Sequence, residues 1–169
     1  MAKIVLQKKL RGVVGLQKTQ EAIKVLNELL QGEYMAVESF NNFISRIEDE
    51  KIKKEFQEIQ QQHRSNIQKL ATHIQNMGGQ PDENLGIKGK MGDMKVSMDL
   101  GFKTDDSEIL KKAIEGETRG VNMAEKILRG NLDDKSRDLV GEILQKDRIA
   151  IRKLKALAEK KCLSSINMG

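Results

Sequence analysis

The chain has 169 residues, a formal net charge of +5, 38% hydrophobic residues and 33% charged residues. This length allows one domain whose hydrophobic core needs neither disulfides nor structural metal, and the single cysteine, Cys162, excludes an internal disulfide. The N-terminus lacks the uninterrupted apolar stretch of a signal peptide or a membrane span, so we expect a bacterial-type cytoplasmic protein with no membrane span.

The first 18 residues are predicted to form a basic, amphipathic N-terminal arm. Five cations lie here among apolar residues, namely Lys3, Lys8, Lys9, Arg11 and Lys18. We expect a leader helix that packs on the rest of the protein or on a neighbouring subunit, and its apolar residues favour a homo-oligomer. Contact with an anionic surface, such as DNA, is the alternative role for the cations.

Apolar residues spaced three and four apart predict four long helices. The first covers residues 19–47 and the second residues 49–77, ending at Gly78 and Gly79 with Pro81 just beyond. The third begins at the capping-type residues 105–107 and reaches residue 128, and the fourth covers residues 133–161. One proline and no tryptophan agree with an all-helical chain. The predicted organisation is thus an arm (1–18), a bundle (19–161) and a C-terminal tail (162–169).

A crossover of residues 80–104 joins the second helix to the third. It contains apolar residues at near-helical spacing, which predict a short fifth helix: Ile87, Met91, Met94, Met98 and Phe102. Thioethers suit Cu(I), but a methionine stripe more often fills gaps at the end of a core, and we do not expect a copper site.

The two halves of the chain repeat one another. At a shift of 84 residues, the difference between positions 117 and 33, residues 58–70 match residues 142–154 in Glu, Ile, Gln, Arg, Ile, Lys and Leu. A duplicated helical hairpin explains this match. Because each hairpin alone is too small to bury its apolar face, the repeat predicts an antiparallel four-helix bundle with one long crossover.

Each predicted helix carries one polar residue on its apolar stripe: Glu33, His63, Glu117 and Asp147. Within each hairpin the two residues lie equally far from the turn, at about 15 residues or roughly 22 Å, so all four are expected in one layer. Burying three carboxylates with an imidazole costs free energy unless something compensates their charge. A metal ion would do so, and oxygen and imidazole ligands suit Fe, Mn or Zn.

This order of residue types resembles the ferritin-like superfamily, whose carboxylate-bridged di-iron members carry Glu, Glu-x-x-His, Glu, Glu-x-x-His. Several motifs more closely resemble a bacterial ferritin-like family of unknown function, described as four-helix-bundle proteins. They are the run from Phe56 to Gly78-Gly79-Gln80-Pro81, then Met98-Asp99-Leu100, Asp105-Asp106 and Ile114-Glu115-Gly116-Glu117. The resemblance covers most of residues 20–158 and implies a ferritin-like fold without an established activity.

The chain departs from the di-iron pattern at three positions. Gln60 and Leu144 stand where that pattern has glutamates, and Asp147 stands where it has the second histidine. The predicted site is therefore degenerate: Glu33, His63, Glu117 and Asp147 could hold one Fe or Mn ion, or two weakly, with Gln60 as a marginal oxygen ligand. The alternative is a buried hydrogen-bonded network left from a metal-binding ancestor. His73 is expected to be a hydrogen-bonded core or edge histidine, and Glu58 and Glu142 are expected to be salt-bridge partners.

No nucleophilic triad, phosphate-binding loop or thiolate metal motif is present in the sequence, so neither a hydrolase nor a nucleotide-binding protein is indicated. We expect a non-enzymatic ferritin-like protein that acts in stress protection or as an assembly component. The alternative is an iron- or manganese-binding redox protein that reacts with oxygen or peroxide. The sequence identifies no small-molecule substrate.

Overall fold

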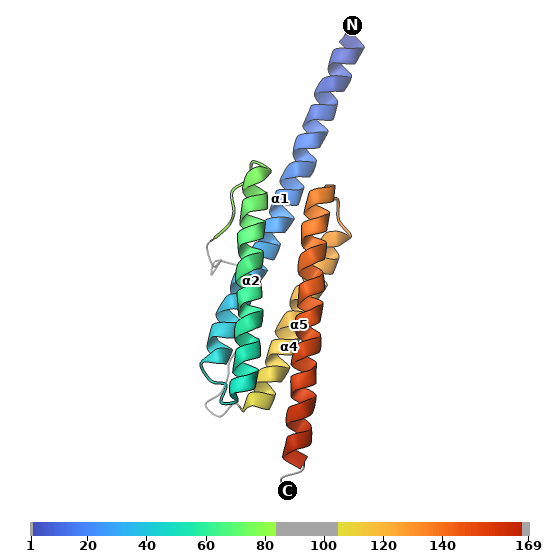
Figure 1. Ribbon diagram of the computed structural model, residues 1–169. Coiled ribbons are helices and arrows are strands. Elements are labelled where there is room, and N and C mark those ends of the chain that lie inside the picture. The colour runs from blue at the N-terminus through green and yellow to red at the C-terminus, as the bar shows by residue number, and fades with distance from the viewer. Residues whose placement is uncertain (1, 84–104, 167–169) are drawn as a thin grey trace.

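The computed structural model describes residues 2–83 and 105–166, with side chains described for residues 12–83 and 105–163. These residues form four helices, α1 (Ala2–Ile44), α2 (Glu50–Asn76), α4 (Asp106–Leu128) and α5 (Asp134–Ile166), and no strand. The helices α1 and α2 form one antiparallel hairpin, and α4 and α5 form a second that packs against it (Figure 1). The predicted four-helix bundle of two hairpins is confirmed. The predicted helix in the crossover falls largely on residues 84–104, outside the described residues.

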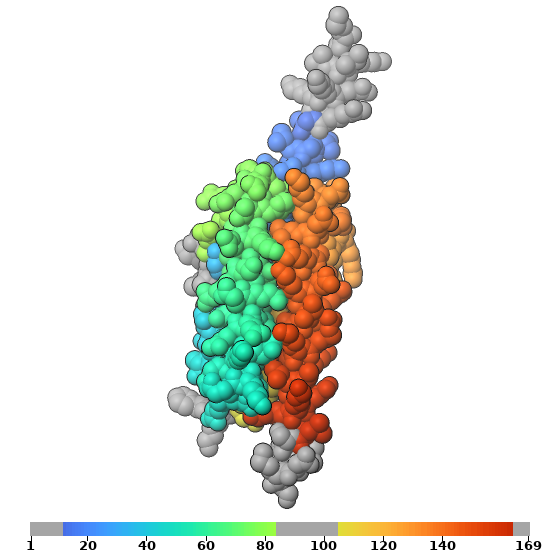
Figure 2. All heavy atoms as spheres, in the orientation of Figure 1, coloured from blue at the N-terminus to red at the C-terminus, as the bar shows by residue number. Residues whose placement is uncertain are grey.

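Two helices are longer than expected. The first begins at Ala2 rather than near residue 19, and α5 continues to Ile166 rather than ending near residue 161. No proline interrupts either segment, and glycines such as Gly12 and Gly15 weaken a helix without ending it. The arm is therefore a continuation of α1, and the part of it that follows residue 11 rises beyond the ends of α2 and α5 (Figure 2).

The predicted caps and turns set the ends of the inner helices. The Asp49 carboxylate accepts hydrogen bonds from the backbone N–H groups of Lys51 and Ile52 at the start of α2, and Asp105 does the same for Glu108 at the start of α4. Gly78 ends α2 with a φ of 79°, a conformation that glycine adopts without steric cost.

Asp106 joins three elements at one end of the bundle. Its carboxylate accepts hydrogen bonds from the backbone N–H groups of Glu48 and Asp49 at 3.0 and 3.2 Å, and from Nζ of Lys161 on α5 at 3.0 Å. Burial alone would raise the pKa of Asp106, but these donors outweigh it and the pKa is lowered.

The hydrophobic core consists of two clusters on either side of a polar layer. One cluster contains Leu26, Leu30, Leu70 and Val140, and the other contains Phe40, Phe56, Leu110 and Leu154. The polar residues predicted from the sequence lie between these clusters along every helix. Among the helices described, none has the length and apolar character that crossing a membrane requires.

Candidate metal centre

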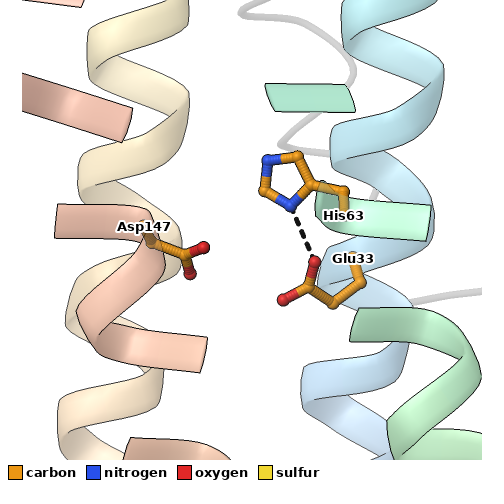
Figure 3. A group of neighbouring side chains, drawn as sticks. All are labelled: Glu33, His63 and Asp147. Atoms are coloured by element: carbon orange, nitrogen blue, oxygen red, sulfur yellow. Dashed lines mark hydrogen bonds and ion pairs between the residues drawn. The ribbon is translucent and has the colours of Figure 1, made fainter. Parts of the chain in front are cut away.

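The four helices of the bundle each place one polar side chain in its centre. Glu33, His63, Glu117 and Asp147 come from α1, α2, α4 and α5, and each is only 3–4% exposed. His63 Nδ1 lies 2.7 Å from Oε2 of Glu33, and His63 Nε2 lies 2.9 Å from Oε1 of Glu117. The carboxylate of Asp147 points across the bundle toward His63 and Glu33, and one potential ligand atom from each of these three residues lies within 4.8 Å of the others (Figure 3).

Burial and charge set the protonation of this layer. Burial lowers the pKa of His63, but the carboxylates of Glu117 and Glu33 together raise it well above its ordinary value. Burial raises the pKa of Asp147 to about 8, with a further contribution from the negative charges of Glu33 and Glu117. At neutral pH the layer therefore contains an imidazolium between two glutamates, beside a protonated aspartic acid.

One carboxylate oxygen in the layer has no partner. Oε2 of Glu117 is buried and accepts no hydrogen bond, whereas Oε1 of the same group is bonded to His63. Leaving a buried acceptor unsatisfied costs about 1–3 kcal/mol, and more when the group is charged. A cation or a hydrogen-bond donor placed next to Oε2 of Glu117 would remove this cost.

Asn66 is a member of the layer that the sequence analysis missed. It is 0% exposed, and its Nδ2 lies 3.3 Å from both carboxylate oxygens of Glu33. The neighbouring Ile67, although apolar, is only partly buried. The sequence signal was present, because alternate spacings of four and three from Ile59 and His63 lead to Asn66 and then Leu70.

Gln60 and Leu144, which stand where the di-iron pattern has glutamates, have different surroundings. The Gln60 side-chain amide donates to the carbonyl of Val37 at 3.1 Å and to Oδ1 of Asn41 at 2.6 Å, so its contacts are with α1 and not with the four central residues. Leu144 is 7% exposed and belongs to an apolar cluster. The layer thus has one imidazole and three carboxylates.

A cavity of about 150 Å³ opens between α1 and α4 and reaches this layer. Its floor includes all four central residues, and its walls are mainly apolar, with Met35, Phe40, Phe43 and Met123. Three glycines also line it, Gly32, Gly116 and Gly120, and a Cβ atom at Gly116 or Gly120 would meet nothing within 4 Å. A small molecule therefore has a route from the surface to the buried carboxylates.

The remaining polar residues singled out in the sequence have structural roles. Nε2 of His73 is hydrogen-bonded to Oγ of Ser136 at 2.8 Å. Glu142 forms ion pairs with Lys69 and Lys146, at 2.5 and 2.7 Å. Glu58 lies 3.8 Å from Lys153. The expectations for His73, Glu58 and Glu142 are confirmed.

Solved structures with the same arrangement of helices are ferritin-like. A dodecameric thioferritin, the bacterioferritin-related protein from Bacteroides fragilis, is 17% identical with a TM-score of 0.73, covering 88% of this chain and 90% of that one. A ferritin-like, diiron-carboxylate protein from Bacillus anthracis is 21% identical with a TM-score of 0.64, covering 83% of this chain and 97% of that one. At these identities the likeness establishes the fold, and the predicted ferritin-like bundle is confirmed.

A third structure shows the same fold as part of a longer protein. It is a two-domain protein from Anabaena variabilis with DJ-1/ThiJ/PfpI-like and ferritin-like domains, 17% identical with a TM-score of 0.71, and the match covers 85% of this chain but only 37% of that one. No curated protein matches the chain. The family described as the domain of unknown function DUF2383 matches residues 21–130, which is more than half of the sequence. The chain therefore belongs to the DUF2383 family and has the ferritin-like fold.

Proposed function

We propose that this protein binds a single iron or manganese ion in its central layer, through Glu33, His63, Glu117 and Asp147. The observation that carries the proposal is the gathering of three buried carboxylates around one imidazole, with Oε2 of Glu117 left without a partner. Oxygen ligands with one imidazole suit iron and manganese, and ferritin-like bundles build metal sites from inward-facing side chains of this kind.

The charge of the layer supports a cation. The layer contains three acidic side chains and only one imidazole, so acidic groups are in excess. With a trivalent ion and a neutral imidazole, three ionised carboxylates would be balanced completely. Burial is the main cause of the raised pKa of Asp147, and the negative charges of Glu33 and Glu117, which such an ion would compensate, contribute as well.

The ligand set favours one metal ion over two. A two-metal carboxylate centre uses a second histidine and two more glutamates, and this layer has Asp147, Gln60 and Leu144 at those positions. The Gln60 amide is engaged by α1, and Leu144 lies among apolar side chains. Gln60 would therefore contribute at most weakly.

A bound iron or manganese ion would supply redox chemistry with oxygen or peroxide. The chain's own contribution is to hold the ligands in place, with Asn66 orienting Glu33, and to admit a small oxidant through the cavity between α1 and α4. Enzymatic turnover is a further step, and a protein that only sequesters the ion would use the same residues.

Metal content measured after loading tests this proposal. The full chain, purified without chelator and then treated with Fe(II) or Mn(II), is expected to retain about one ion per chain after desalting. Glu117→Gln should lose most of this metal, whereas Glu115→Gln, which changes an exposed carboxylate on the same helix, should retain it. Wild-type protein that retains no metal would instead establish the central layer as a hydrogen-bonded network.

A second candidate function is assembly without catalysis, and the exposed start of α1 supports it. Val13, Val14 and Leu16 are 51%, 47% and 67% exposed on the part of the helix that rises beyond the bundle. Packing of this segment against another copy would bury these side chains, which favours a homo-oligomer. Analytical ultracentrifugation of wild type and Leu16→Glu tests this: equal masses would remove α1 as the contact.

A further inference from the structure

We propose that the cavity between α1 and α4 is a binding site for a small aromatic alcohol, with its ring among the apolar walls and its hydroxyl group donating to Glu117. As a binding site this does not depend on a metal ion. As a substrate site of the metal-loaded protein it rests on the proposed function.

The volume and the walls define the body of this ligand. A cavity of about 150 Å³ has the size that holds one benzene molecule when its walls are apolar. Phe40 and Phe43 line it with their rings 5.9 Å apart, and Met35 and Met123 add two thioether sulfurs. Aromatic rings and sulfur atoms both make favourable contacts with another aromatic ring.

The floor defines the polar group of the ligand. Oε2 of Glu117 is buried, has no hydrogen-bond partner and belongs to a side chain that lines the cavity. A hydroxyl donor would satisfy it with a charge-assisted hydrogen bond. An anionic ligand would meet the carboxylates of Glu33 and Glu117, and the rim carries both signs of charge, with Lys112, Glu115 and Arg119. A neutral molecule with one donor group suits the apolar walls and the unpartnered oxygen of Glu117.

Two glycines of α4, Gly116 and Gly120, lie at the edge of the cavity. A glycine inside a helix costs about 0.5–1 kcal/mol relative to alanine, and such a position usually reflects a close approach of another element. No close approach explains Gly116 or Gly120, because an added Cβ atom would meet nothing within 4 Å. Both residues line the cavity, Gly116 at an exposed and Gly120 at a half-buried position, so a large side chain at either one would occupy space at its edge.

Ligand-observed NMR on the metal-free full chain tests this inference, with phenol as the probe and benzene as the analogue without a donor. We expect saturable phenol binding with a Kd on the order of 1 mM, as suits a ligand of this size. Benzene should bind about tenfold more weakly because it cannot satisfy Glu117. No saturable binding of phenol, or equal binding of the two compounds, would overturn the inference.

Substitutions that fill the cavity locate the binding. Gly120→Leu is expected to weaken phenol binding at least about tenfold, and Gly116→Leu serves as a second filled variant. Gly141→Leu is the matched control, because a side chain at this α5 glycine also meets nothing within 4 Å and Gly141 does not line the cavity. Phenol binding that survives in both α4 variants, or that is lost in the control, refutes the assignment.

The two proposals fail separately. Metal-free protein that binds phenol but never retains iron or manganese would keep the binding site and remove the metal function. Protein that retains metal but does not bind phenol would keep the metal function and remove the phenol-binding site.

Discussion

Replacing Asp147 by asparagine should remove a pH-dependent loss of stability in the metal-free protein. Asp147 is 4% exposed, and burial, with Glu33 and Glu117 nearby, raises its pKa from 3.8 to about 8. An acid whose pKa is raised by folding stabilises the fold fully below its unfolded pKa, and this contribution is lost as the pH rises toward the folded value. Asparagine keeps the shape and one acceptor but does not titrate.

The magnitude follows from the width of this pH window. Between pH 3.8 and about 8 the folded side chain keeps its proton while the unfolded one has lost it. Each pH unit in this range therefore costs about 1.4 kcal/mol of unfolding free energy. From pH 5 to pH 7 the contribution of Asp147 amounts to about 3 kcal/mol. The raised pKa of His63 has an effect in the same direction. Its stabilising contribution is complete below the ordinary pKa of histidine and decreases as the pH rises from there toward the folded pKa.

Urea denaturation followed by circular dichroism measures this difference. The metal-free wild type should lose about 3 kcal/mol more than Asp147→Asn between pH 5 and pH 7. The matched control is Asp138→Asn, at an exposed position of the same helix, which should follow the wild type. Parallel pH dependences for wild type and Asp147→Asn would show that Asp147 is ionised in the folded protein over this range, and the reasoning would be refuted.

Three further outcomes are expected. Asp106→Asn should destabilise the protein by about 2 kcal/mol in urea denaturation at pH 7, because it removes the charged partner of Lys161 and of two backbone N–H groups; equal midpoints would contradict this. Gly120→Ala should raise the free energy of unfolding by about 0.5–1 kcal/mol, and a destabilised variant would show that the position is more crowded than it appears. Iron or manganese affinity, measured by competition with a chelator of known affinity, should rise between pH 6 and pH 8 as Asp147 loses its proton more readily; an affinity independent of pH would exclude Asp147 as a ligand.

The positions of the four central residues could be predicted from the sequence because two periodic signals agree. The repeat at 84 residues places Glu117 and Asp147 at the positions of Glu33 and His63, and the antiparallel hairpins bring each pair to the same height. A polar residue on a buried stripe is rare enough to stand out at each position. The helix ends marked by the capping residue Asp105 and by Gly78 could also be predicted, since local chemistry determines them.

Other features depend on three-dimensional packing that spacing does not encode. The sequence cannot show that Gly116 and Gly120 border a cavity, because the space depends on how far α4 lies from α1. It also does not show that Glu117 bonds to His63 across the bundle while its second oxygen stays unpaired. The start of α1 at Ala2 was missed because the N-terminal part of this helix extends beyond the other helices. Without packing partners, it has no need for the apolar stripe from which the other helix bounds were predicted.

The two repeated hairpins have diverged at their centres, and this difference bears on function. In the first hairpin Glu33 and His63 are bonded to each other, whereas in the second Glu117 turns to His63 and Asp147 has only the amide of Gln62, at 3.4 Å. One imidazole thus serves both halves. A fold selected only for stability would have little reason to keep an unpartnered carboxylate oxygen and a strongly perturbed acid beside an open cavity. These costs lie together in one layer, which supports the proposal that this layer binds an iron or manganese ion.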